Sequence, residues 1–377
     1  MKRKPRGLSA GEMARRIAAL APPELAEAWD NVGLQVGDPA RRVARLMVCL
    51  ETTASTLAEA RRRRADAILA HHPLIFRPLK SLLWDDPAQR LVTELARAGL
   101  TLIVAHTNLD AAAWGTNQAL AEACGLWPTA PLEPRSAAAP FKLVVFTPQG
   151  HESAVIEAIA RGGGGQIGLY THCTFRTPGV GTFRGGEGAQ PYIGEAGRLE
   201  SAEEFRLEAV VPASAARSVL DEVLKVHPYE EPAYEFYPLA EAAPRTGLGC
   251  LAELTRAEPA ELWVKRLKRK LRLKRVRLAG PLGRPIRRVA ICTGSGGGLL
   301  RRAREVGAHA LLTGEAHYHH GIEAHQLGIL LIEVGHFESE RLVATPLARR
   351  LAADPALQAA GVEVFAATDD LQPFRWV

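Results

Sequence analysis

The stretch VARLMVCLETTASTLAEARRRRADAILAHHP, residues 43–73, decides the fold class. It opens with an apolar run of strand length at 43–50, continues with a polar, helix-forming segment at 53–64, and closes with a second apolar run at 67–70. Two apolar runs separated by a helix predict a βαβ unit, because parallel strands need a long crossover between them. Both faces of such a sheet are covered by helices, which explains why its strands are apolar throughout.

The same alternation of apolar runs and helices continues on both sides of this stretch. Strands are expected at 101–105, 286–293, 310–313 and 330–334, and helices at 87–99, 116–125, 299–306, 321–327 and 339–351. The first and last thirds of the chain therefore predict two parts of one α/β domain with mainly parallel strands.

The middle of the chain differs from this pattern. Four prolines between 128 and 140 indicate a linker. After it, strand and helix segments form two β-α-β-like halves, which is typical of an α+β insert of about 100 residues. We therefore predict the first α/β part at 1–134, an insert domain at 138–242, and the second α/β part at 244–377.

Length and composition limit the class of protein. The chain has 377 residues, 47% of them hydrophobic, which suggests two or three domains. No apolar run is long enough to cross a bilayer, and residues 1–20 predict an amphipathic helix without the apolar core of a secretory signal. Five scattered cysteines without a CxxC pair make a disulfide framework or a thiolate zinc site unexpected, and they favour the cytoplasm.

The net charge of +6 is concentrated in part between residues 265 and 277, where nine of thirteen residues are Lys or Arg. Such a run is compatible with nucleic-acid binding. Leu267, Leu271 and Leu273 are spaced along it roughly as in a helix, and no aromatic residues accompany the charges. We therefore favour a solvated helix face, and a flat response of nucleic-acid affinity to salt would argue against binding.

Polar residues with metal-binding side chains follow four of the apolar runs. Seven of the 12 histidines lie in these four places. If the four strands share one parallel sheet, their carboxyl ends meet at one crevice, where ligands bind in open α/β sheets. The four segments are HHP at 71–73, HTNLD at 106–110, GEAHYHH at 314–320 and GHFESE at 335–340.

Spacing within these segments indicates a metal site. His71 and His72 are adjacent, so in extended structure their side chains reach opposite directions. His336 and Glu340 are four residues apart, which places them on one face of a helix. Imidazole and carboxylate ligands without thiolate suit Zn²⁺, Fe²⁺, Mn²⁺, Co²⁺ or Ni²⁺. With Asp110 there are five candidate ligands, too many for one catalytic zinc and better suited to two ions ~3.5–4 Å apart with a bridging carboxylate.

Two loops offer weaker signals. The glycine loop GSGGG at 294–298 follows a strand and precedes a helix, so it is equally compatible with an anion cradle and with a tight turn. The loop WDNVGLQVG at 29–37 combines a tryptophan with acid and amide groups. Such loop residues often build sites, and the alternative is a turn anchored by Trp29.

Together these motifs resemble the Nif3-like (DUF34) family, whose members are also named GTP cyclohydrolase 1 type 2 homologues. The motifs occur in the family's order and span nearly the whole chain. The matching segments are WDNVGLQVGD at 29–38, HHP at 71–73, HTNLD at 106–110, GSGGG at 294–298, TGEAHYHH at 313–320 and GHFESE at 335–340.

The resemblance implies an α/β fold with a dinuclear metal centre, assembled as a toroidal homohexamer. His72 and Asp110 would hold one ion, His71 and His336 the other, and Glu340 would bridge them. His106 and His317 would lie nearby as candidate catalytic residues. The insert, which contains HPYEEPAYEFYPL at 227–239, resembles a ferredoxin-like PII/CutA domain.

These inferences favour a metal-dependent hydrolase acting on a nucleotide or related small molecule, with His106 or His317 transferring protons. The family name suggests GTP, opened at the C8 carbon of its purine ring, and a phosphoester is an equal alternative. Two other classes remain open. One is a non-catalytic metal-binding ring with a regulatory or chaperone role, and the other is a nucleic-acid-binding ring.

Overall fold

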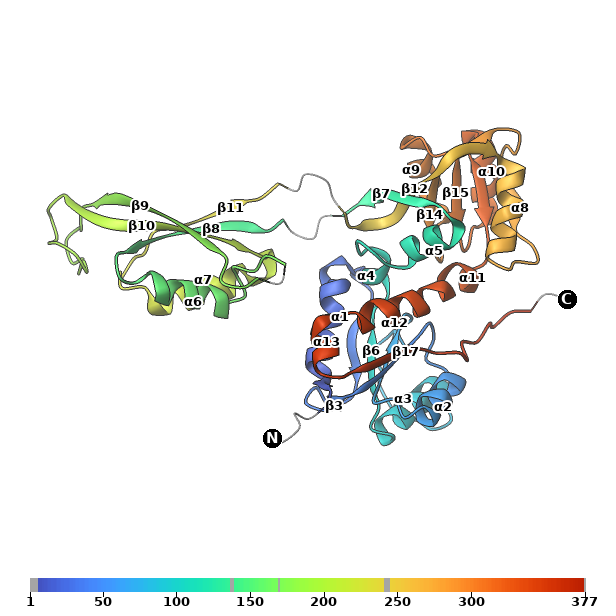
Figure 1. Cartoon of the computed structure of the whole chain (residues 1–377), viewed down its shortest axis with the longest axis horizontal. Coiled ribbons are helices and arrows are strands. Elements are labelled where there is room, and N and C mark those ends of the chain that lie inside the picture. Colours follow the sequence, from blue (N-terminus) through green and yellow to red (C-terminus); the bar gives the residue numbers. More distant parts are fainter. Residues whose placement is uncertain (1–5, 136–138, 169, 241–244, 376–377) are drawn as a thin grey trace. The chain divides into compact units, whose positions relative to one another are not determined.

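The structure is a computed structural model that describes residues 6–135, 139–168, 170–240 and 245–375. The chain divides into two compact units (Figure 1). The first unit combines residues 1–137 with 244–377, and the second consists of residues 138–243. The predicted boundaries at 138 and at 242–244 lie outside the described residues. Among the residues described, no helix has the length and apolar character of a membrane span.

The first unit contains one five-stranded sheet of order β17-β4-β5-β6-β2. Four adjacent strands of this sheet, β17, β4, β5 and β6, run parallel. Strand β2 forms one edge and is antiparallel to β6. The strands are β2 (Gly33–Val36), β4 (Arg45–Cys49), β5 (Ala67–Ala70), β6 (Thr101–Val104) and β17 (Glu363–Ala366), and a short β1 (Leu8–Ser9) pairs with β3 (Arg42–Val43). The decisive stretch therefore forms the predicted βαβ unit.

Helices cover both faces of this sheet because side chains alternate between the faces along each strand. Leu46 and Val48 of β4 pack with α1 and α12 on one face. Met47 packs with α2 and α3 on the other. The helices are α1 (Ala10–Leu20), α2 (Ala54–Arg62), α3 (Pro87–Arg97), α12 (Ala344–Ala352) and α13 (Pro355–Ala359).

The first unit also contains a six-stranded sheet of order β13-β16-β15-β14-β12-β7. Its three strands β14, β15 and β16 are parallel, and the outer strands join antiparallel. The strands are β7 (Trp127–Pro134), β12 (Gly247–Pro259), β13 (Arg277–Ala279), β14 (Pro285–Cys292), β15 (Ala310–Thr313) and β16 (Leu330–Glu333). The helices are α5 (Thr116–Cys124), α8 (Ala260–Lys270), α9 (Leu300–Glu305) and α10 (Tyr318–Leu327).

This arrangement confirms the mixed α/β prediction and corrects one condition of it. The four strands that precede the metal-binding segments do not share one sheet. β5 and β6 belong to the five-stranded sheet, whereas β15 and β16 belong to the six-stranded sheet. Apolar runs identify buried strands, but nothing in them specifies which sheet a strand joins.

The predicted linker at 128–140 is also wrong over most of its described length. Residues Trp127–Pro134 form β7, which pairs with β12. Because β7 is the last strand of its sheet, only one of its edges needs hydrogen-bond donors. Proline, which lacks an N–H, is tolerated on such an edge strand. The proline-rich composition therefore marks an edge.

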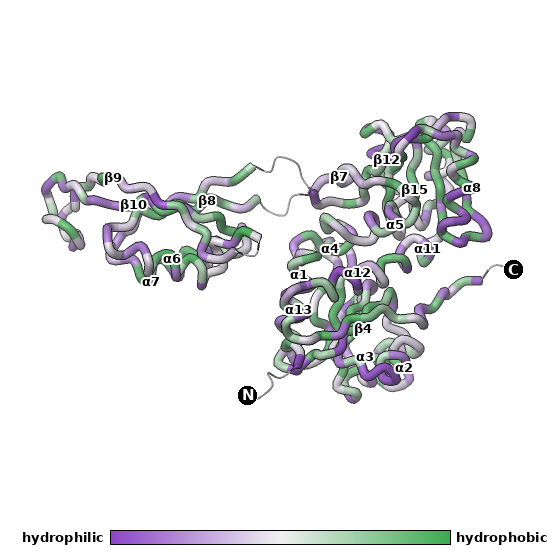
Figure 2. The backbone as a smooth tube through the Cα atoms, in the orientation of Figure 1, coloured by the Kyte–Doolittle hydropathy of each residue, from purple (hydrophilic) through white to green (hydrophobic). Residues whose placement is uncertain are grey.

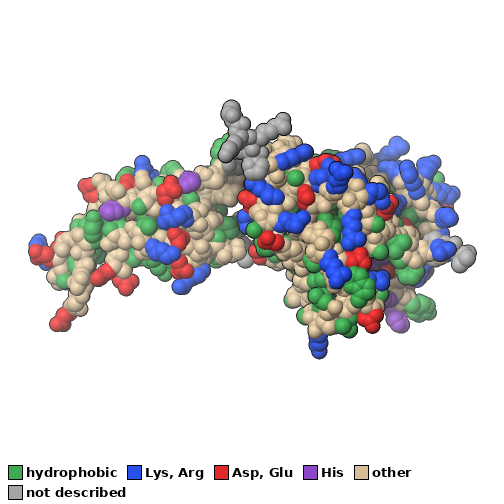
Figure 3. Space-filling view, turned by 90° about the horizontal axis from the view of Figure 1, so that it is seen from below, with side chains coloured by type: hydrophobic (Ala, Val, Ile, Leu, Met, Phe, Trp, Pro, Cys, Tyr) green, Lys and Arg blue, Asp and Glu red, His purple; other side chains and the backbone are tan. Residues whose placement is uncertain are grey.

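The basic run forms the predicted helix over part of its length. It supplies the last turns of α8, where Leu267 is buried, and Leu271 directly after the helix is buried as well. Figure 2 shows much of α8 as hydrophilic, and its buried positions also include Trp263 and Val264. The run ends at Arg277, the first residue of β13. In the view of Figure 3, basic side chains are frequent on the first unit and acidic side chains lie among them.

The second unit is a four-stranded antiparallel sheet of order β11-β8-β10-β9 with two helices. The helices pack with the sheet around a core that includes Leu143, Val155, Leu207 and Val219. The chain order is the β-α-β-β-α-β sequence of ferredoxin-like folds. The elements are β8 (Phe141–Pro148), α6 (Glu152–Arg161), β9 (Thr174–Phe183), β10 (Glu200–Val211), α7 (Ala216–Val226) and β11 (Tyr234–Pro238).

Candidate metal centre

The adjacent histidines follow the end of β5, as the sequence predicts. His71 is buried, with 3% of its surface exposed, and its Nδ1–H donates to the carbonyl of Ala105 at 2.9 Å. Because a carbonyl only accepts, this bond fixes the proton on Nδ1 and leaves a lone pair on Nε2. Burial, together with the neighbouring His72, lowers the pKa of His71 to about 3. His71 is therefore a neutral imidazole, the form that binds metal.

The other histidines of the centre are oriented in the same way, each by an oxygen near its Nδ1. The oxygen is that of Glu51 for His72, at 2.5 Å, and that of Asp30 for His106, at 2.9 Å. For His336 it is a carboxylate oxygen of Glu315, at 3.2 Å. An oxygen partner on one ring nitrogen is the usual companion of a metal bond on the other.

Glu340 connects the two sheets at this point. It lies with His336 on the short helix α11 (His336–Glu340), directly after β16, and is 4% exposed. Its Oε2 lies 3.1 Å from Nε2 of His336 and 3.1 Å from Nε2 of His72. Its Oε1 lies 4.0 Å from Nε2 of His71. The same His71 nitrogen is 3.7 Å from Oδ1 of Asp110, at the end of α4 (Thr107–Asp110).

All five residues predicted as metal ligands thus meet around one buried carboxylate. The distances divide them differently from the resemblance: His71 lies toward Oε1 of Glu340 with Asp110 beside it, and His72 and His336 lie toward Oε2. Ligand atoms of His72, His336 and Glu340 lie within 4.8 Å of one another, as do those of His71, His72 and His106. Both sets are compact enough to hold a divalent ion.

The electrostatics of the cluster fit divalent cations. Nε2 of His71 is buried and lacks a hydrogen bond within the described part of the chain. A buried polar atom without a partner destabilises the fold unless a metal ion or another group binds to it. Burial and the nearby charge of Glu340 raise the pKa of Asp110. Burial opposes the charge of His72, but its hydrogen bonds to Glu340 and Glu51 raise its pKa to about 10, and the hydrogen bond to Glu340 raises the pKa of His336 to about 9. A divalent cation can replace these protons between Glu340 and the imidazole nitrogens.

His106 and His317 have different positions. The ring of His106 lies 5.2 Å from that of His71 and 5.3 Å from that of His72, so it adjoins the cluster. His317 is exposed at the start of α10, where its ring lies 5.5 Å from that of His320. It lines a separate, smaller pocket with Tyr318. The structure does not bring His317 to the cluster in this chain.

The cluster borders a cavity of about 780 Å³, which His72 and His336 line directly. Its remaining walls carry both signs of charge. The charged residues that line it are Glu51, Arg275, Arg277, Glu315, Glu333, Glu338 and Arg375. A small molecule held in this cavity would contact both histidines.

The family assignment follows from comparison of the whole chain. The model of Duf34/NIF3 (NGG1p interacting factor 3) matches residues 8–373. The chain belongs to this family. A Bacillus subtilis (strain 168) protein named GTP cyclohydrolase 1 type 2 homolog is 35% identical over 357 residues, 95% of each protein. A relative of the same name from Halalkalibacterium halodurans is 38% identical over 316 residues, 84% of this chain and 85% of the relative.

Solved structures agree with this assignment. The crystal structure of a Bacillus cereus protein related to NIF3 has a TM-score of 0.81 and 33% sequence identity to this chain. The match covers 98% of this chain and 99% of the Bacillus cereus protein. A Staphylococcus aureus protein has a TM-score of 0.78, 26% identity and the same coverage.

The glycine loop of this NIF3-family chain acts mainly as a close turn. Gly294 has φ +60°, and a Cβ built on it would lie 2.5 Å from Oε1 of Glu340. Its N–H donates to Ser339, and the N–H of Gly296 donates to Thr313, both at 3.0 Å. These donors are occupied within the protein, which favours the turn over the anion cradle. The glycine leaves room for the central carboxylate.

Sequence reasoning missed three supporting residues of the NIF3-family site, namely Asp30, Glu51 and Thr116. Asp30 accepts hydrogen bonds from His106 and from the backbone of Thr107 at 3.1 Å. Burial opposes its charge, but these bonds outweigh burial and lower the pKa of Asp30 to about 2. Thr116 donates to Asp110. Asp30 lies in the tryptophan loop, whose acid and amide groups were the available signal.

Replacing Glu51 with glutamine is expected to weaken metal affinity about 10–100-fold, because loss of an orienting carboxylate typically has that effect. The amide keeps the shape of the side chain but not its charge beside Nδ1 of His72. Competition with a metal-binding dye would measure the change. Glu24, an exposed acid in the same unit, provides the control as Glu24→Gln. Equal affinities of both variants and the wild type would contradict the role of Glu51.

Proposed function

We propose that this chain holds two divalent metal ions at the cluster and uses them to hydrolyse a nucleotide or a related small molecule. His71 and Asp110 are assigned to one ion, His72 and His336 to the other, with Glu340 between them. The observation that carries the proposal is the meeting of these side chains, drawn from two sheets, beside a large cavity.

Bound divalent ions would supply Lewis acidity and lower the pKa of bound water. The chain's own residues position the substrate and move protons. His106 adjoins the cluster, and its Nδ1 is held by the ionised Asp30. A carboxylate in this position orients an imidazole and stabilises its protonated form, as general acid–base catalysis requires. We therefore assign proton transfer to His106.

The cavity has room for a substrate of nucleotide size. Its volume of about 780 Å³ lies within the range of small-molecule sites. Three arginines, Arg275, Arg277 and Arg375, line it among four acids, and guanidinium groups pair well with phosphate, although Arg277 already pairs with Glu333 at 3.0 Å. The name shared by the Bacillus subtilis relative points to GTP, which carries both a ring and phosphates.

Metal analysis of protein purified without chelator tests the first half of the proposal. We expect about two divalent ions per chain, with Zn, Fe, Mn, Co and Ni measured together. Screening nucleotides and phosphoesters with the metal restored tests the second half. A stoichiometry well below two that reconstitution does not raise would refute the dinuclear assignment. Two bound ions without turnover on any substrate would instead support a non-catalytic metal-binding protein.

Replacing His106 with alanine is expected to lower turnover about 100-fold while leaving the metal content unchanged, since a positioned proton donor typically contributes at least that much. Turnover and metal content would be measured on the same sample. His319→Ala, which removes an exposed histidine of α10, serves as the control. If His106→Ala loses an ion as well, His106 is a ligand and its catalytic assignment is wrong.

We further propose the toroidal homohexamer that the family resemblance implies, with the ferredoxin-like insert as a PII/CutA-like domain. Light scattering coupled to size-exclusion chromatography would give the mass of the assembly directly. A monomeric mass at micromolar concentration would contradict the ring. It would also remove the basis for encircling a nucleic acid.

A further inference from the structure

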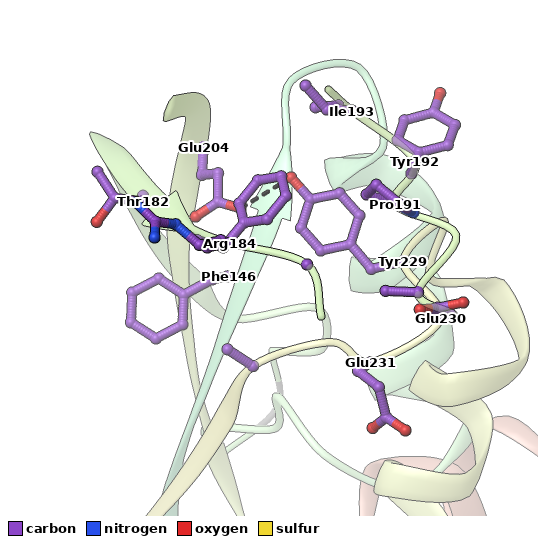
Figure 4. A pocket seen from close by; sticks show the side chains of 15 residues that line it. Phe146, Thr182, Arg184, Pro191, Tyr192, Ile193, Glu204, Tyr229, Glu230 and Glu231 are labelled. Atoms are coloured by element: carbon purple, nitrogen blue, oxygen red, sulfur yellow. Dashed lines mark hydrogen bonds between the residues drawn. The ribbon is translucent and has the colours of Figure 1, made fainter. Parts of the chain in front are cut away.

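The second unit contains a cavity that the metal chemistry does not use. It has a volume of about 360 Å³, and every residue that lines it lies between positions 146 and 233. Its walls come from β8, from the end of β9 and the loop after it, from β10, and from the segment that follows α7 (Figure 4). It is therefore a feature of the insert itself.

Aromatic side chains form much of the cavity wall. Phe146, Phe183, Tyr192 and Tyr229 all line it. The rings of Tyr192 and Tyr229 are tilted, with centroids 6.1 Å apart. Tyr192 is 55% exposed at the rim, whereas Tyr229 is half-buried. The face of an aromatic ring carries the negative side of its quadrupole, which a cationic ligand can approach.

Glu204 is the half-buried charge of this cavity. The hydroxyl of Tyr229 donates to its Oε1 at 2.8 Å, and Figure 4 shows the two side chains directed at each other. No other hydrogen bond or ion pair to this carboxylate occurs in the part of the chain that the structure describes. The exposed Glu230 and Glu231 add two acids against one base, Arg184. The lining is thus acidic overall, and the carboxylate of Glu204 is available to pair with a ligand.

The loop that closes one side is held in place by polar contacts. Nε2 of His151 lies 3.1 Å from the hydroxyl of Tyr192. The backbone N–H of Gln190 donates to Glu230 at 3.1 Å. Because the aromatic rim is held by His151, directly before α6, and by the segment after α7, the site is formed before a ligand arrives. Preorganisation of this kind reduces the entropy lost on binding.

We propose that this cavity binds a small organic cation, an ammonium group attached to an apolar or aromatic body. The ammonium pairs with Glu204, and the body packs against Tyr229, Tyr192 and Phe146. Cations are attracted to aromatic faces, and a charge-assisted bond to a carboxylate adds to that attraction. The volume limits the ligand to a small molecule. This proposal does not depend on the metal centre, because the cavity belongs to the other unit.

Calorimetric titration of the full chain with phenethylammonium, compared with the neutral 2-phenylethanol, tests the proposal. We expect saturable binding of one phenethylammonium per chain and at least about tenfold weaker binding of the alcohol, which lacks the charge. Glu204→Gln is expected to bind the cation about tenfold more weakly than the wild type. Glu187→Gln, an exposed acid of the same unit outside the cavity lining, should leave the affinity unchanged.

Equal binding of the two probes would overturn the proposal, and so would the absence of saturable binding. Unchanged affinity in a folded Glu204→Gln variant would overturn the role of Glu204. If that variant does not fold, the comparison of the two probes on the wild-type chain still decides. Metal content of the Glu204→Gln sample reports on the first unit separately.

Discussion

Replacing Glu340 with glutamine is expected to reduce the bound metal from about two ions per chain to fewer than one and to abolish metal-dependent turnover. Its two oxygens face different sets of histidines, so one substitution affects both ions. Glutamine preserves the volume of the side chain but replaces one oxygen by an NH₂ group, which cannot coordinate a cation. Removing this buried negative charge also leaves the surrounding imidazoles without their main counter-charge.

The matched control is Glu338→Gln, the same change two residues earlier on the same helix. Glu338 accepts a hydrogen bond from Gln372 at 2.7 Å and does not belong to either compact ligand set. We expect Glu338→Gln to retain its metal, as measured by elemental analysis. Two ions per chain in folded Glu340→Gln would show that Glu340 is not the bridge.

Much of the fold follows from periodicity and strand length alone. The boundaries of β5 and β15 coincide with the predicted strands, because strands buried on both faces are mainly apolar. The same reasoning fails where pairing partners decide the structure. β7 is formed by a proline-rich segment, and β12 pairs with it from more than 100 residues away. The composition of a segment does not predict a pairing strand that lies far away in the sequence.

The sequence singles out the residues that meet in the cluster but not how they are arranged, and their binding of metal stays a proposal. Adjacency of His71 and His72 and the helical spacing of His336 and Glu340 are local patterns, so the sequence displays them. The division of ligands between the two oxygens of Glu340 depends on how two sheets pack together. Asp30 lies in the tryptophan loop that the sequence singles out, but its role and that of Glu51 were missed, because an acid that orients a histidine carries no distinctive spacing. Their roles appear only when the imidazole nitrogens are placed.

Removing the metal with a chelator is expected to lower the unfolding temperature of the first unit by roughly 5 °C or more. A ligand present at 100 times its dissociation constant adds about 2.7 kcal/mol to stability, and each kcal/mol shifts a large domain by roughly 2 °C. The effect is expected to reach the whole unit because the ligands come from both of its sheets. His72 follows a strand of one sheet and His336 a strand of the other.

Differential scanning calorimetry of metal-loaded and metal-stripped protein measures this shift, and the insert supplies an internal control. Its compact core contains no candidate ligand, so its transition is expected to stay in place. Glu340→Gln should unfold at the same temperature with and without added metal. Identical transitions for loaded and verified metal-free wild type would mean that the ions contribute nothing to holding the sheets together. The cluster would then be a site that the fold positions but does not need for its stability.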